Sequence, residues 1–102
     1  MISVIVPIKD EPPGLVERFV RFTHSPQDAE LIVADGGGDE RTREAFRQAG
    51  ARVLSVAGTR GSRLGQAAAS ARGDVLFFLH SDSRPPDDAL ALISRSLAEG
   101  VD

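Results

Sequence analysis

Residues 74–83 read DVLFFLHSDS, an apolar run that leads directly into polar side chains. The consecutive apolar residues 75–79 predict a strand buried on both faces, as in a parallel sheet. His80, Ser81 and Asp82 follow at once. Ligands of open α/β sheets bind just beyond the carboxyl ends of the strands, so these side chains are candidates for a metal or phosphate site. The alternative is a polar turn in which Asp82 or Ser83 helps to cap the next helix.

Three further strands are predicted around this stretch, and each strand is followed by a helix. Apolar runs place these strands at residues 2–8, 30–35 and 52–56. Helical spacing and end signals place the helices at about 15–24, 40–49, 62–71 and 84–99. Asp39 is a suitable N-cap, Gly50 suits a helix end, and Arg60 falls in a flexible loop at 57–62. The alternation predicts one α/β domain with a parallel sheet, right-handed crossovers and helices on both faces.

Acidic side chains follow three of the four predicted strands. If the strands lie in the order 3-2-1-4, the chain reverses between strands 1 and 4 and a crevice opens there. Asp10 and Glu11, Asp35, and Asp82 would then meet at one rim. Asp35 can accept a hydrogen bond from a nucleobase N–H, with Gly36 allowing close approach of the base and ribose. The alternative for Asp35 is a local Asx turn.

Other side chains near the strand ends suit a diphosphate and its metal ion. A carboxylate such as Asp82 can hold Mg²⁺ or Mn²⁺ while phosphates supply the remaining oxygen ligands. His80 would favour Mn²⁺, unless it bonds a backbone carbonyl instead. Arg60 and Arg63 flank a glycine and can meet a diphosphate, although solvated surface arginines are the commoner case.

Composition narrows the classes of partner and compartment. The 102 residues suffice for one small domain, and the net charge of −3 argues against nucleic-acid binding. The sequence has no cysteine, which removes disulfides, thiolate zinc sites and thiol nucleophiles and fits a reducing compartment. The apolar N-terminal run is too short to span a membrane. We therefore expect a cytoplasmic, soluble chain.

Four segments together resemble a known family. They are residues 3–11, 31–37, 50–53 and 71–83. In this order and at these spacings they resemble the nucleotide-sugar-binding half of a family 2 glycosyltransferase, with the Rossmann-like GT-A fold. Residues 80–83 are similar to the metal motif His-Ala-Asp-Thr of a bacterial subgroup. The resemblance spans nearly the whole chain.

The resemblance implies roles for individual residues. Pro7 and Glu11 would lie beside the base and ribose, and Asp35 would recognise the base. Asp82 would bind a divalent metal, Mn²⁺ or Mg²⁺, from the second acidic position of the family's Asp-X-Asp motif, and His80 occupies the first. Further contacts with the nucleotide sugar would come from Gly36, Arg60, Arg63 and Ser81.

The chain also departs from the family pattern. Gly65 and Ala67 stand where an asparagine and a glycine are usual, and Gly37-Gly38-Asp39 replaces a Ser-Thr-Asp turn. The larger departure is length, because residues 1–102 match only the donor half. A complete enzyme would transfer sugar with inversion from a nucleotide diphosphate to an acceptor hydroxyl. Its acceptor half, with the catalytic base, would lie beyond Asp102, so this chain alone would transfer sugar poorly. A lipid or peripheral-membrane acceptor is one option for the full enzyme.

Two other functions remain open. Residues 58–65 are faintly similar to the glycine-rich loop of a nucleotidyltransferase, although that loop would normally follow strand 1. A non-catalytic nucleotide-binding or oligomerisation module is the other alternative. As an edge strand, residues 75–79 would expose apolar side chains and unpaired backbone, so we expect missing sequence or a second copy of the chain to cover them.

Overall fold

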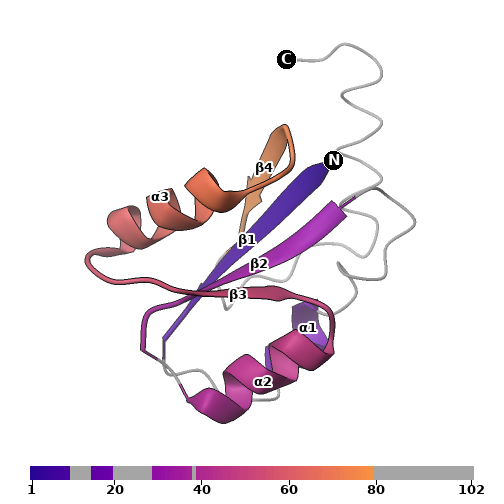
Figure 1. The fold of residues 1–102 in the computed structure, drawn as a ribbon, viewed down its shortest axis with the longest axis vertical. Helices are drawn as coiled ribbons and strands as arrows, with labels where there is room; N and C mark the ends of the chain where they lie inside the picture. Colours follow the sequence, from indigo (N-terminus) through magenta and orange to yellow (C-terminus); the bar gives the residue numbers. More distant parts are fainter. Residues whose placement is uncertain (10–14, 20–28, 38, 80–102) are drawn as a thin grey trace.

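A four-stranded parallel sheet forms the centre of the molecule (Figure 1). The computed structural model describes residues 1–9, 15–19, 29–37 and 39–79. The strands are β1 (Ile2–Ile8), β2 (Ala29–Asp35), β3 (Arg52–Ser55) and β4 (Val75–Phe78). Their spatial order is β3-β2-β1-β4, and each neighbouring pair is parallel. The predicted α/β class and strand order 3-2-1-4 are confirmed.

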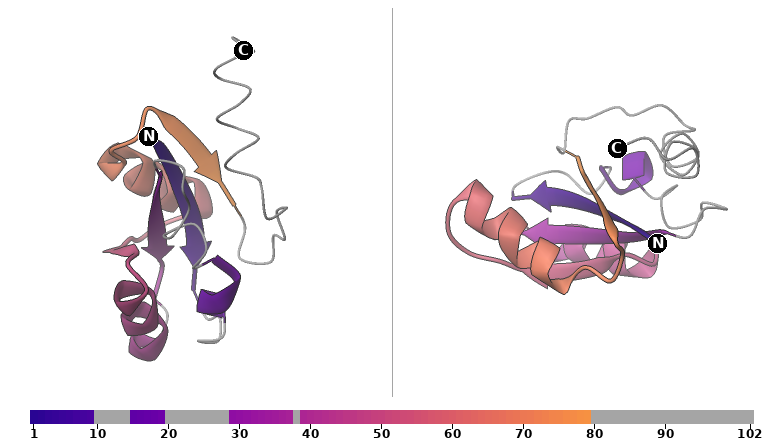
Figure 2. Two further views of the ribbon diagram at one scale, coloured as in Figure 1. Left: turned by 90° about the vertical axis from the view of Figure 1, so that its right-hand side faces the viewer. Right: turned by 90° about the horizontal axis from the view of Figure 1, so that it is seen from above.

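Helices cover both faces of the sheet, as predicted. On one face, Phe19 of α1 (Leu15–Phe19) and Phe46 of α2 (Glu40–Gln48) pack against the even-numbered residues of β1. On the other face, Ala67 of α3 (Arg60–Ser70) packs against Ile5. Figure 2 shows α1 and α3 on opposite sides of the strands. Every residue of β1 is buried because this strand lies inside the sheet and under both layers.

Pro7 lies at the position in β1 where a proline interrupts the fewest hydrogen bonds. The carbonyl of Ile5 accepts from Leu79 N at 2.9 Å, so odd-numbered residues of β1 point their backbone groups toward β4. The paired residues of β1 and β4 run from Ile2–Val75 to Ile5–Phe78, short of Pro7. The N–H that proline lacks would therefore face the side where pairing with β4 has ended.

The start of α3 differs from the predicted loop and helix. Residues 57–62 were expected to form a loop carrying Arg60, with the helix at 62–71, but the helix begins at Arg60 and ends at Ser70. Thr59 is its N-cap, and the Thr59 hydroxyl oxygen accepts a hydrogen bond from Ser62 N at 3.2 Å. This cap satisfies a first-turn N–H and starts the helix despite Gly61 and Gly65. Asp39 caps α2 as predicted, and Gly50 after that helix has a φ of 98°.

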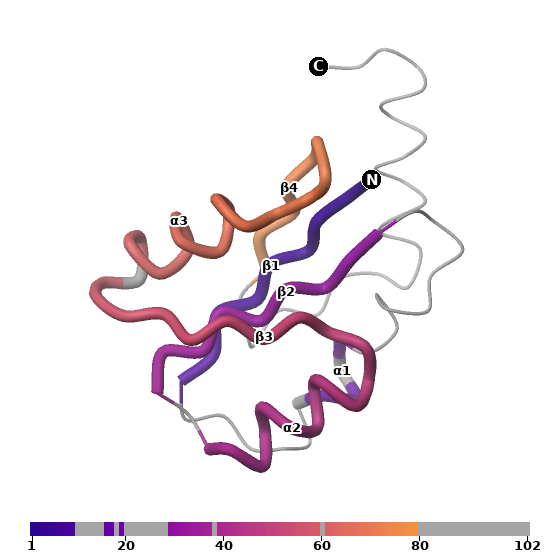
Figure 3. The backbone as a smooth tube through the Cα atoms, viewed as in Figure 1, coloured from indigo at the N-terminus to yellow at the C-terminus, as the bar shows by residue number. Residues whose placement is uncertain are grey.

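The prediction that residues 75–79 are buried on both faces is wrong. Val75 and Phe77 pack partly against the core beside α1 and α2, whereas Leu76 is 40% and Phe78 46% exposed. The cause is position, because β4 pairs with β1 on one side and has no strand partner on its other side among the described residues. Figure 3 shows β4 beside the central β1. The helix expected at 84–99 lies outside the described residues.

A cluster of polar groups joins the strands at the amino-terminal end of the sheet. Glu30 of β2 accepts hydrogen bonds from Ser3 Oγ at 2.6 Å, Arg52 Nη1 at 2.7 Å and Arg72 N at 2.7 Å. Burial by itself would raise the pKa of Glu30, but these hydrogen bonds outweigh it and lower the pKa below its ordinary value. Ser3 Oγ also accepts from Gly73 N at 2.9 Å, which brings the chain before β4 onto β1.

Candidate functional site

The carboxyl ends of β1, β2 and β3 meet at the turn formed by residues 35–37. Gly36 N donates to Ile8 O at 2.9 Å, and Val56 N donates to Asp35 O at 2.9 Å. The backbone of this turn is therefore bonded to both strands that flank β2. It lies at the edge of the sheet where ligands of open α/β folds bind.

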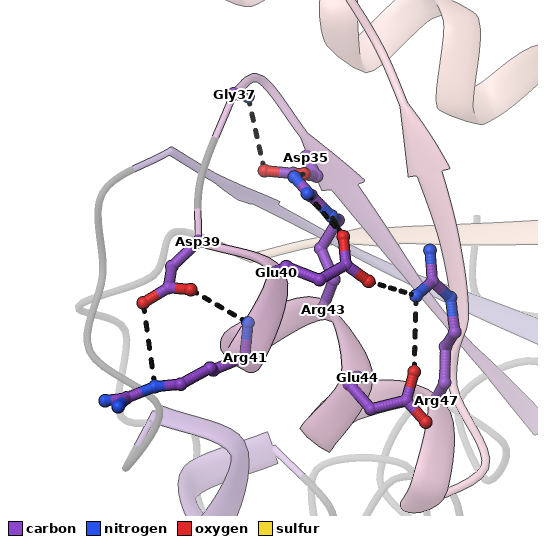
Figure 4. A network of polar contacts seen from close by, with 8 residues as sticks. All are labelled: Asp35, Gly37, Asp39, Glu40, Arg41, Arg43, Glu44 and Arg47. Atoms are coloured by element: carbon purple, nitrogen blue, oxygen red, sulfur yellow. Dashed lines mark hydrogen bonds and ion pairs between the residues drawn. The ribbon is translucent and has the colours of Figure 1, made fainter.

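Asp35 ends β2, and its side chain is buried, with only 1% of its surface exposed. Its carboxylate forms an ion pair with Arg43 (Figure 4). Arg43 Nη1 of α2 donates to Asp35 Oδ2 at 2.6 Å, and Gly37 N donates to Asp35 Oδ1 at 3.3 Å. The second contact forms the Asx-type turn that the sequence left as an alternative. The hydrogen bond to Asp35 is the main reason that the pKa of Arg43 is raised, so its guanidinium stays charged.

Arg63 approaches the same turn from the other face of the sheet. Ala67, one helical turn later in α3, is fully buried, which places Arg63 on the sheet-facing side of the helix. A Cβ placed on Gly36 would lie only 3.0 Å from Arg63 Cδ and 3.2 Å from its Cζ. The Arg63 side chain is half-buried against Gly36, and its Nε is buried with no hydrogen-bond partner among the described residues. The turn thus carries one paired arginine and one arginine with an unsatisfied donor.

The described residues bring together only part of the predicted site. Asp35, Gly36 and Arg63 are in contact through the turn, Pro7 lies buried in β1 opposite Ala34, and Arg60 begins α3. Glu11, His80, Ser81 and Asp82 lie outside the described residues, so the predicted metal ligands cannot be placed. Within the described part, no three His, Cys, Asp or Glu side chains gather as they would around a metal ion.

Sequence reasoning missed Arg43. This arginine donates to Asp35 and, through Nε at 2.8 Å, to Glu40 Oε2, while Glu40 Oε1 accepts from Arg47 at 3.0 Å (Figure 4). A signal was present, because Arg43 follows the N-cap Asp39 by one helical turn in the helix directly after the Asp35 turn. The charged residues of α2 have the pattern of an ordinary solvated helix face. That pattern gives no indication that Arg43 points inward to Asp35.

Solved structures similar to this chain include complexes of glucosyl-3-phosphoglycerate synthase. The complex of glucosyl-3-phosphoglycerate synthase from Mycobacterium tuberculosis with Mn²⁺, UDP and glucosyl-3-phosphoglycerate is 26% identical, with a TM-score of 0.73 over 95% of this chain and 39% of that chain. Its complex with Mn²⁺, UDP-glucose and glycerol 3-phosphate is 27% identical, with a TM-score of 0.73 over 98% of this chain and 40% of the other. The chain thus spans about two fifths of the length of these proteins.

Comparison with protein families identifies the chain. None of the curated proteins compared with it matches. None of the helices in the described ranges is long and apolar enough to cross a membrane. The family model for glycosyl transferase family 2 matches residues 3–102. Together with the parallel sheet and the structural similarity, this match confirms the resemblance and the Rossmann-like GT-A fold class, whereas the likeness of residues 80–83 to a His-Ala-Asp-Thr motif stays a prediction. The chain belongs to glycosyl transferase family 2.

Proposed function

We propose that this chain binds a nucleotide-diphosphate sugar together with Mn²⁺ or Mg²⁺, as the donor half of an inverting glycosyltransferase. Family membership supports this function, as do similar structures solved in complex with Mn²⁺ and UDP or UDP-glucose. The observation that carries the proposal is Arg63, a half-buried guanidinium with an unsatisfied Nε at the ligand-binding edge of the sheet. The proposed compartment is the cytoplasm.

An anionic ligand would satisfy Arg63. Leaving a buried donor unpaired costs about 1–3 kcal/mol, so a partner for this guanidinium is favoured. Guanidinium groups bind phosphate oxygens through paired N–H donors, which suits a diphosphate. We assign Arg63, with Arg60 one turn earlier in α3, to the diphosphate. Pro7, Glu11, Asp35 and Gly36 are assigned to the part of the site that receives the base and ribose, and Ser81 to the remaining donor contacts.

Asp82 and His80 are the residues proposed to hold the divalent metal. A carboxylate suits Mg²⁺ or Mn²⁺, and an added imidazole shifts the preference toward Mn²⁺. The bound ion would stabilise negative charge on the leaving diphosphate. This chain's own residues would bind and orient the donor at the sheet edge.

Residues 1–102 are proposed to be the donor-binding part of a larger GT-A enzyme. Their match to about two fifths of the similar synthase supports this division. The general base and the acceptor site, which a lipid acceptor would also need, would then come from further sequence. General base catalysis contributes roughly 10²–10⁴-fold, so we propose that this chain alone transfers sugar poorly.

A nucleotide titration tests this function. We expect uridine diphosphate to bind more tightly with Mn²⁺ than without it, and Asp82→Ala to remove that difference. Arg63→Gln should weaken binding by about ten-fold or more, as loss of a charged hydrogen bond implies. Gly36→Ala should weaken it too, because the added methyl group displaces the Arg63 side chain but keeps its charge. Isothermal titration calorimetry measures each affinity.

Arg72→Gln is the matched control, because it removes an exposed arginine at the opposite end of the sheet but keeps the backbone N–H that Glu30 accepts. Its affinity should equal that of the unmodified chain. Preference for a nucleoside triphosphate would favour a nucleotidyltransferase-like domain. Absence of binding by the folded protein would favour a non-catalytic module.

The edge strand β4 supports a further proposal, namely that a second copy of the chain or additional sequence covers it. Leu76 and Phe78 are exposed side by side on this edge. We expect the chain to associate as its concentration rises, and Phe78→Lys to reduce association because edge lysines oppose strand pairing. Sedimentation velocity measures this, with Gln48→Lys on exposed α2 as the control. A compact monomer at high concentration would contradict the proposal.

A further inference from the structure

Two arginines approach residues 35–37 from opposite faces of the sheet. Among the described residues, only Arg43 forms an ion pair there. Arg43 from α2 pairs with Asp35 Oδ2 at 2.6 Å, whereas Arg63 from α3 lies against Gly36 with its Nε unsatisfied. Asp35 is 1% exposed, and both of its carboxylate oxygens accept hydrogen bonds. In this arrangement the carboxylate cannot turn toward a ligand without breaking a buried ion pair.

The partner of Asp35 is itself held in place. Glu40 accepts from both Nε and Nη2 of Arg43, which fixes the plane of the guanidinium, and Arg47 in turn holds Glu40 (Figure 4). A continuous set of hydrogen bonds therefore runs from α2 through Arg43 and Asp35 to Gly37 N. Gly37 has a φ of 119°, a conformation that residues other than glycine rarely adopt. The backbone of the turn therefore has an unusual shape, which these hydrogen bonds can stabilise.

We infer that Asp35 and Arg43 are a positioning pair, which holds the Gly36–Gly37 backbone in the shape that receives the nucleobase end of the donor. This inference rests on the proposed function and gives Asp35 an indirect role in it. The ligand would meet the backbone of the turn and Arg63, while the buried carboxylate acts from behind the turn. Arg63 depends on the same backbone, because its aliphatic part lies against Gly36.

A double-mutant cycle separates the indirect role from direct contact. Uridine diphosphate with Mn²⁺ is the probe, and its affinity is measured for Asp35→Asn, Arg43→Gln and the double variant. Arg43→Gln removes the ion pair of the buried Asp35 carboxylate, and Asp35→Asn turns an amide donor toward Arg43, which then keeps only Glu40 of this pair of acidic partners. We therefore expect about a ten-fold loss or more in each. The double variant places two neutral amides face to face and should recover most of the loss. A double variant as weak as Asp35→Asn would mean that Asp35 contacts the ligand, and would overturn the inference.

The amide proton of Gly37 provides a second signal that needs no ligand. Its NMR resonance should shift in both single variants, return toward its original position in the double variant, and return partly in Arg43→Lys, which keeps the charge. Arg41→Gln is the matched control, because Arg41 lies in the same helix, its side chain is exposed beside Asp39, and it takes no part in the contacts between Glu40, Arg43 and Asp35. An unmoved Gly37 resonance in folded Arg43→Gln would overturn the inference.

Nucleotide affinity and the Gly37 resonance test different claims, so the proposed function and the positioning role can be rejected independently. If the unmodified chain binds neither uridine diphosphate nor another nucleoside diphosphate with Mn²⁺, the proposed function fails, while the Gly37 resonances still decide whether the pair holds the turn. If uridine diphosphate binds but the Gly37 resonance does not shift in Arg43→Gln, the proposed function stands and the inferred positioning role of Asp35 and Arg43 is wrong.

Discussion

Gly73→Ala is expected to lower the free energy of unfolding by about 1–3 kcal/mol, the usual cost of forcing an extra carbon into a packed site. A Cβ at this position would lie 2.6 Å from Met1 O, 2.9 Å from Ser3 N and 2.7 Å from Ser3 Oγ. Two of these atoms belong to the backbone at the start of β1. They cannot retreat easily, because β1 is paired with β2 on one side and β4 on the other.

Denaturant unfolding followed by circular dichroism measures this change. Gly65→Ala is a control of opposite sign, because in the described part of the chain no atom outside its own stretch of helix lies within 4 Å of a Cβ placed there. Gly65 lies inside α3, so alanine should stabilise the protein by roughly 0.5–1 kcal/mol through its higher helix propensity. Equal stability of Gly73→Ala and the unmodified chain would show that β1 and the segment before β4 are not in close contact.

Glu30→Gln is expected to destabilise the fold by about 1–3 kcal/mol, since it weakens charge-assisted hydrogen bonds in a poorly hydrated cluster. Glu30 is 12% exposed and accepts from donors on three other segments of the chain. The amide has one acceptor oxygen in place of two and presents donors to Arg52. The half-exposed Glu44 on α2 is the matched control, because its contact with Arg47 is 3.5 Å long and Glu44→Gln should change little.

The same carboxylate predicts how stability changes with pH. The pKa of Glu30 is lowered in the folded state, so its contribution is present above the ordinary value of 4.5 and is lost as pH falls through the lower folded value. The stability difference between the unmodified chain and Glu30→Gln should therefore shrink on acidification. Urea unfolding at neutral pH and well below pH 4.5 tests this. A difference that stays constant would mean that the charge of Glu30 does not contribute.

Much of the fold was predictable because apolar runs and turn residues report on local burial. Residues 2–8 formed the predicted strand to the residue, and Asp39 capped α2 as its type and position indicated. Arg60 was misplaced because glycines at 58, 61 and 65 indicate a loop, while the Thr59 cap acts through a single hydrogen bond. The burial of residues 75–79 was overestimated because apolar runs do not report whether a strand has neighbours on both sides.

The candidate site was less predictable than the fold. Asp35 was found because it follows an apolar strand, and strand ends are where open α/β sheets bind ligands. Its pairing with Arg43 depends on the angle at which α2 packs, and sequence spacing does not encode that angle. The unsatisfied Nε of Arg63 likewise emerges only when α3 is packed against Gly36. Sequence patterns thus identified the residues at the ends of strands. They did not identify the side chains of the covering helices that contact those strand ends.

Pro7 has a consequence for the pairing of β1 with β4. After the bond from Leu79 N to Ile5 O, the next link along this pair of strands would require an N–H at residue 7, which proline lacks. The proline ring therefore removes one hydrogen bond from any continuation of this ladder, while the Pro7 carbonyl keeps its ability to accept one. The chemistry of one backbone nitrogen thus weakens further pairing on this side of β1, and substitutions in the surrounding side chains cannot restore that bond.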